Sequence, residues 1–115
     1  MANISAAATG YKTAMIATAG PRTIEAAAFS MVTEELRTAA TRADVDYPGY
    51  IAALSKNLSL WTILAADAAH SGNRLPLELR AAVIRLAAFV RGHTMRLQQG
   101  GLIGVEALVE INDNM

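Results

Sequence analysis

Stretches of turn-forming residues divide this chain into a few long segments. Residues 44–49 (DVDYPG) and 70–75 (HSGNRL) are rich in such residues, and Gly100 with Gly101 marks a third break. These residue types favour loops. Proline stands at Pro21 and Pro76, where it suits the first turn of a helix. No run alternates with period two, so no strand is predicted. The pattern predicts helices over about 21–43, 50–69, 76–98 and 105–112.

The predicted fold is all-α: a small antiparallel bundle of four main helices, because short loops favour antiparallel neighbours. A chain of 115 residues corresponds to one domain. We therefore expect 1–115 to form a single helical domain with its core in 21–112. A weaker helical pattern over 4–18 would add a short N-terminal helix. The segment 1–18 could also be mobile or exchange between protomers, and the sequence leaves these alternatives open.

Helical-wheel positions give the first two long segments one apolar face each. Trp61 is the largest side chain of the second face and is interpreted as a core aromatic, since an indole buries a large area. The first face includes Met31 and also Glu25, whose carboxylate suits a first helical turn. An inward Glu25 paired with an arginine is the alternative. The predicted core consists of Ile24, Val32, Leu36, Leu54, Trp61, Leu64, Leu79, Val83, Leu86 and Val90, closed at one end by Leu102, Leu108 and Val109.

The segment 76–98 is apolar on nearly all sides. Ile84 and Ala88 lie opposite its main apolar face, and Phe89 lies off that face. Such a helix is either packed between two neighbours or shared with a partner. Both interpretations remain open on the sequence alone.

Arginines flank this second apolar surface on both sides, with Arg80 and Arg91 on one flank and Arg85 and Arg96 on the other. They are either solvated side chains, helped by the C-terminal acids Glu106, Glu110 and Asp113, or basic rims for an amphipathic helix with acidic edges. On the second interpretation, the candidate partner-binding residues are Arg80, Ala81, Ile84, Arg85, Ala88, Phe89 and Arg91.

Several classes of function are excluded or disfavoured. The chain has no Cys, which excludes disulfides, thiolate metal sites and cysteine nucleophiles. His70 and His93 do not have metal-binding spacing, and no phosphate-binding loop is present, so neither a metal nor another cofactor is expected. His93 is interpreted as a half-buried helix residue. Without a cluster of titratable groups, no enzyme is expected.

Charge and hydropathy limit the partners. Ten basic and ten acidic residues give a formal charge of zero, which argues against a nucleic-acid partner. No apolar stretch reaches the length of a membrane span. No basic residue precedes Lys12, so no signal peptide is recognised. We expect a cytoplasmic protein.

An ordered set of short motifs resembles the FlaF family of flagellar biosynthesis proteins. The most specific is N-x-x-L-W-x-x-L-A-A-D at 57–67, followed by N-x-L-P-x-x-L-R at 73–80. A Pro-Arg-x-x-Glu helix start precedes them, and His93-Thr94 and Ile111-Asn112 are similar to later landmarks. The chain departs from the pattern at Leu58, Ser59 and Phe89. The motif residues, expected to be mainly structural, are Pro21, Arg22, Glu25, Asn57, Trp61, Asp67, Pro76 and His93.

The resemblance implies a cytoplasmic helical protein that binds flagellin as an export chaperone and works alongside FlbT, which acts on flagellin translation. An apolar groove would cover an amphipathic terminal helix of flagellin without any catalytic residue. Two alternatives stay open. The protein could be a regulator that contacts flagellin mRNA or the translation machinery, or a regulatory partner that binds FlbT or another protein and touches neither flagellin nor RNA.

Overall fold

The computed structural model describes residues 22–100 and 104–115, with side chains from Ala26 onward. This part of the chain forms four helices and contains no strand. They are α2 (Arg22–Thr41), α3 (Tyr47–Ala69), α4 (Leu77–Gln98) and α5 (Glu106–Asp113). The predicted all-α fold is confirmed. The predicted segment 4–18, Pro21 and Leu102 lie outside the described residues, as do the side chains of Arg22, Ile24 and Glu25.

The helix α3 begins at Tyr47 rather than at position 50, so the loop predicted over 44–49 was wrong in its second half. The cause is a helix cap. The Asp46 carboxylate accepts a hydrogen bond from the Gly49 backbone N–H at 3.0 Å, and Pro48 occupies the first turn. A Cβ atom on Gly49 would overlap this carboxylate. The turn-forming residues therefore start a helix here.

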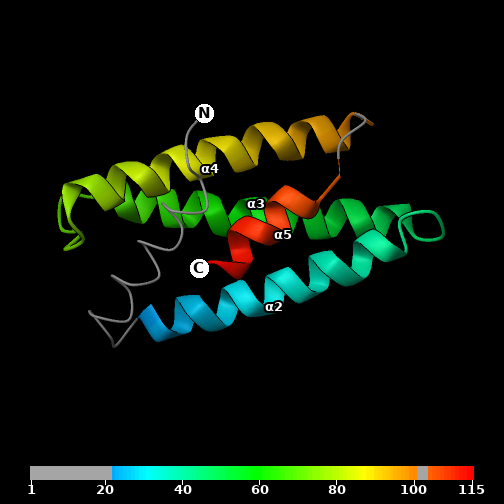
Figure 1. Cartoon of the computed structure of the whole chain (residues 1–115), viewed down its shortest axis with the longest axis horizontal. Helices are drawn as coiled ribbons and strands as arrows, with labels where there is room; N and C mark the ends of the chain where they lie inside the picture. Colours follow the sequence, from blue (N-terminus) through cyan, green and yellow to red (C-terminus); the bar gives the residue numbers. More distant parts are fainter. Residues whose placement is uncertain (1–21, 101–103) are drawn as a thin grey trace.

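Of the three long helices, α3 runs antiparallel to α2, and α4 runs antiparallel to α3 (Figure 1). The central one is α3, which packs against both α2 and α4, while the short α5 packs against α2. Among the described residues, α4 packs chiefly on α3, and α3 is the helix that lies between two long neighbours. The interpretation of 76–98 as a helix packed between two neighbours is not tested by these residues and stays a prediction. None of these helices has the length and hydropathy of a membrane span.

The core is centred on Trp61, which is fully buried and meets Phe29 edge-on with ring centroids 5.3 Å apart. Edge-to-face contact is a favoured arrangement for aromatic rings. Of the predicted core, the following residues are buried: Val32, Leu36, Leu54, Trp61, Leu64, Val83, Leu86, Val90 and Leu108. Leu79 is only half-buried because it lies in the first turn of α4, at the end of the bundle. Val109 is partly buried and packs against the core.

The buried face of α2 differs from the predicted one. It is formed by Phe29, Val32, Thr33 and Leu36, whereas Met31 is 64% exposed. The difference is a rotation of the helix about its axis. Alanines surround these positions and count as apolar on any face, so the wheel did not identify Phe29 as the residue that meets Trp61.

Candidate partner-binding surface

The motif residues Asn57 and Trp61 lie in the interior, where they hold α5 to α3. Trp61 Nε1–H donates to Asn112 Oδ1 at 2.9 Å, and Asn112 Nδ2–H donates to Asn57 Oδ1 at 2.7 Å. All three side chains are buried. Hydrogen bonds between buried groups fix their relative positions because breaking them leaves further polar groups unpaired, and Asn57 Nδ2 is already buried without a partner among the described residues. Sequence patterning gave no sign that Asn112 joins this network.

The connection between α3 and α4 is held by Asp67, Asn73 and Arg80. Asn73 Nδ2–H lies 3.1 Å from the Asp67 carbonyl oxygen and 3.2 Å from Asp67 Oδ2. Arg80 donates from Nε to the Ala68 carbonyl at 2.6 Å and from Nη2 to the His70 carbonyl at 3.0 Å. These carbonyls belong to the C-terminal end of α3, where a cation is favoured. Arg80 therefore contacts its own fold, which limits what it can offer a partner.

His93 is buried rather than half-buried, with 9% of its surface exposed. Its Nε2 lies 2.7 Å from the Gly104 carbonyl oxygen. Because a carbonyl can only accept, this nitrogen carries the proton. The ring stacks on Phe89, with centroids 5.5 Å apart. Phe89 and His93 thus lie together on α4, and His93 bonds the chain just before α5.

The exposed apolar part of α4, here called the outer face, consists of Ile84, Ala88 and Met95. Ile84 is 42% exposed and Met95 is 44% exposed. These residues border a groove of about 440 Å³ between α3 and α4. The groove is lined by Thr62 and Ala65 of α3 and by Ile84, Ala88, Arg91 and Met95 of α4. Of the other predicted partner-binding residues, Arg85 and Arg91 are exposed, and Arg80, Ala81 and Phe89 are half-buried.

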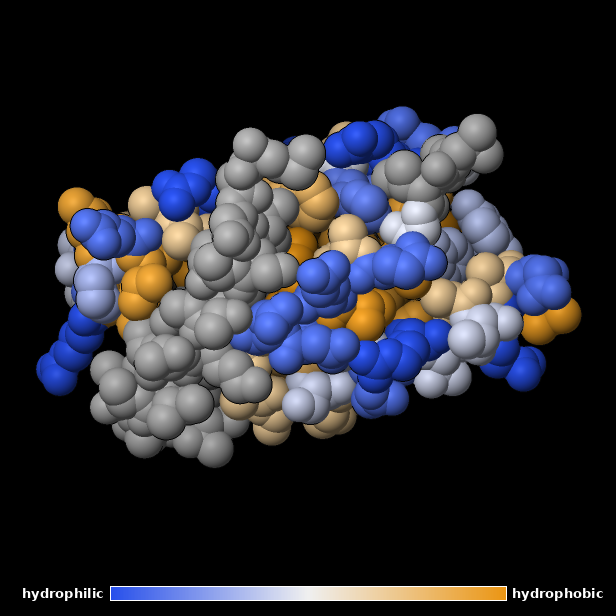
Figure 2. Space-filling model, in the orientation of Figure 1, coloured by the Kyte–Doolittle hydropathy of each residue, from blue (hydrophilic) through white to orange (hydrophobic). Residues whose placement is uncertain are grey.

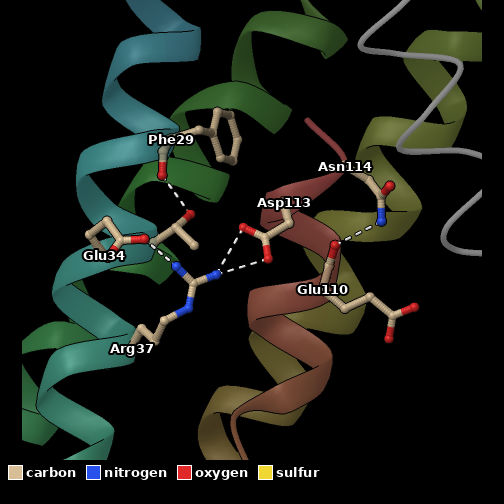
Figure 3. A network of polar contacts seen from close by, with 7 residues as sticks. Phe29, Glu34, Arg37, Glu110, Asp113 and Asn114 are labelled. Carbon is tan, nitrogen blue, oxygen red and sulfur yellow. Dashed lines mark hydrogen bonds and ion pairs between the residues drawn. The ribbon is translucent and has the colours of Figure 1, made fainter.

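The arginines on α4 have no acidic partner among the described residues. Arg85, Arg91 and Arg96 are exposed and form no hydrogen bond or ion pair there. Asp113 instead bonds Arg37 of α2, with its two carboxylate oxygens 2.9 and 3.1 Å from Arg37 Nη2 (Figure 3). The idea that Asp113 supports the α4 arginines is therefore wrong. The Asp113 carboxylate forms an ion pair that links α5 to α2.

Two other grooves in the described residues contain charged side chains that pair with each other. A groove of about 610 Å³ between α2 and α3 contains both Glu35 and Lys56, which form an ion pair at 2.9 Å. Hydrophilic side chains lie over the junction of α2 and α5 (Figure 2), where a groove of about 570 Å³ contains the paired Arg37 and Asp113 beside apolar Val105 and Val109. No group of His, Cys, Asp or Glu side chains in the described ranges could hold a metal ion. The groove beside the outer face of α4 differs from these two because Ile84 and Met95 expose apolar surface there and Arg91 has no acidic partner among the described residues.

Comparison with known proteins gives one family. Residues 7–115 match the family described as "Flagellar protein FlaF". The match spans almost the whole chain and confirms the resemblance inferred from the motifs. No curated protein and no solved structure matches the chain.

Proposed function

Since the chain belongs to the FlaF family of flagellar proteins, we propose that it binds flagellin in the cytoplasm as an export chaperone. The contact surface in this proposal is the outer face of α4. The terminal segments of flagellin are amphipathic helices that are disordered before assembly. A chaperone must cover their apolar stripe and later release it, which requires a binding groove and no catalytic residue.

The observation that supports this proposal is the unmatched outer face of α4. Ile84 and Met95 expose apolar surface beside Arg91, and no described residue covers or neutralises them. Exposed apolar surface with a polar rim is typical of a protein-binding site. A helix laid in such a groove would bury its own apolar stripe against these side chains. Met95 suits this contact because its unbranched side chain adapts to different partners.

The test is co-expression with the cognate flagellin, followed by size-exclusion chromatography with light-scattering mass. We expect a complex of defined stoichiometry. Ile84→Glu should weaken it while leaving the unfolding midpoint of the free protein unchanged, because Ile84 is exposed. Met31→Glu is the matched control, since Met31 is 64% exposed on α2, away from the outer face of α4. Separate elution of the two wild-type proteins at micromolar concentration would refute a tight chaperone role.

A second candidate function is regulation of flagellin synthesis. The unpaired Arg85, Arg91 and Arg96 favour it, because arginines bind phosphates. Binding to a flagellin leader RNA should then fall steeply as salt concentration rises. The absence of binding at low salt would eliminate the RNA form of this function. Capture of FlbT from cells without flagellin would support a purely regulatory partner role instead.

A further inference from the structure

The outer face of α4 continues toward the N-terminus of the helix at a regular spacing. Its positions advance by four and three residues in turn, which is the heptad spacing of a coiled-coil seam. The seam consists of Leu77, Ala81, Ile84, Ala88, Arg91 and Met95. Leu77 is 75% exposed, so the apolar surface extends to the start of the helix. The seam is about 28 Å long at 1.5 Å per residue.

This seam is separate from the face that holds α4 in the fold. The buried face of α4 includes Val83, Leu86, Val90 and Leu97, which lie in the hydrophobic core. Ile84 and Ala88 point the other way and are exposed. The helix α4 therefore has two apolar faces, and only one of them packs against the rest of the described fold.

Gly92 gives an independent sign of close contact on this side. It lies inside α4, where glycine is unfavourable compared with alanine. A Cβ atom added at Gly92 would meet no described atom within 4 Å. The described fold therefore gives no steric reason for glycine. Together with Ala81 and Ala88, it leaves room for the backbone of a partner helix to approach closely.

The charge of the seam selects the partner. Arg91 interrupts the apolar positions, and Arg85 and Arg96 border them, while Glu78 is the only acidic residue in α4. A partner helix must therefore bring acidic side chains opposite Arg91 and along its flank. A second copy of this chain is a poor occupant because it would bring the same arginines together.

We infer that this seam binds one amphipathic helix of about 20 residues in coiled-coil packing. The partner helix carries large apolar residues opposite Ala81, Ala88 and Gly92, and an acidic residue opposite Arg91. The inference rests on the proposed function, because the helix it names is a terminal segment of flagellin. It adds the seam positions against which that segment packs and the charge pattern by which it is recognised.

The experiment measures binding of purified cognate flagellin to the full chain by titration calorimetry. Arg91→Glu should weaken binding at least about tenfold, since it sets two acidic groups together. Gly92→Leu should weaken it by a similar factor, because it overpacks a close contact. Gly92→Ala should raise the unfolding midpoint of the free protein and still weaken binding. Arg42→Glu, on an exposed arginine after α2, is the matched charge control and should bind like wild type.

A cysteine scan tests the register directly, because the chain has no Cys of its own. Single cysteines at Ala81, Ala88 and Met95 should be protected from alkylation when flagellin is bound, and a cysteine at Ala66, exposed on α3, should not. If wild-type protein fails to bind flagellin, the proposed function is wrong. If it binds, and the Arg91 and Gly92 variants bind equally well, the seam is wrong while the proposed function stands. If the wild-type protein self-associates and these variants abolish that self-association, the occupant of the seam is a second copy of this chain and not flagellin.

Discussion

Removing the Asn112 side chain should destabilise the whole protein. Its amide accepts from Trp61 Nε1 and donates to Asn57 Oδ1 in the interior. Asn112→Ala leaves both partners buried and unpaired, at about 1–3 kcal/mol each. For the two groups together we expect a loss on the order of 3 kcal/mol in the free energy of unfolding.

Urea and thermal denaturation are the assays, both monitored by far-UV circular dichroism and by the fluorescence of Trp61, the single tryptophan. A loss of this size should lower the unfolding midpoint temperature by roughly 12 °C, at about 4 °C per kcal/mol for a chain of this length. Asn114→Ala is the control, since Asn114 donates to the Glu110 carbonyl at 2.9 Å in a half-exposed position. Its effect should stay within about 0.5 kcal/mol.

The reasoning would be refuted by an Asn112→Ala variant that loses less than about 1 kcal/mol, because the two buried groups would then have other partners. A double-mutant cycle with Asn57→Ala separates the shared hydrogen bond from the space left by each side chain. Residues in one hydrogen-bond network typically couple by about 0.5–3 kcal/mol. Additive effects would show that Asn57 and Asn112 act independently.

Three further predictions concern single residues. Arg80→Met should lower the free energy of unfolding by about 1.5–3 kcal/mol in chemical denaturation, because the carbonyls at the end of α3 lose a charged donor. Gly49→Ala should lower it by about 1 kcal/mol in the same assay, because the added Cβ displaces the Asp46 cap. Burial, with smaller contributions from Tyr47 and Glu106, raises the pKa of Tyr50 above 10.0. The stability that the neutral phenol contributes should therefore be present below pH 10 and be lost as pH rises through the folded-state pKa, and Tyr50→Phe should remove this loss in pH-dependent denaturation.

The sequence predicts the helices well because turn residues and helical periodicity are local signals. It fails where a decision depends on the rest of the fold. The rotation of α2 depends on which side chain meets Trp61. Phe29 and Met31 are both apolar residue types, so a helical wheel does not tell them apart. The Asn57–Asn112 contact joins residues 55 apart in the sequence, and no periodicity describes it. The cap at Asp46 looked like a loop because capping and turn residues are the same types.

The candidate surface was predicted in part because it is also a local pattern. A second apolar face on α4 is visible from spacing alone, but whether a neighbouring helix covers it depends on tertiary packing. The structure shows that Ile84 is exposed and that Arg80 of α4 donates a hydrogen bond to a carbonyl at the end of α3. The role of the remaining residues in binding stays a prediction until flagellin binding is measured.

The two faces of α4 explain how a protein can keep apolar surface exposed without losing its fold. Val83, Leu86 and Val90 supply the contact with α3, so Ile84 and Ala88 are free to change without opening the core. Exposed apolar patches favour self-association. Here Arg85, Arg91 and Arg96 place positive charge along the same face, which opposes close approach of a second copy through that face. On the proposed function the same charge favours an acidic partner helix, so one arrangement of arginines would limit self-association and select the partner.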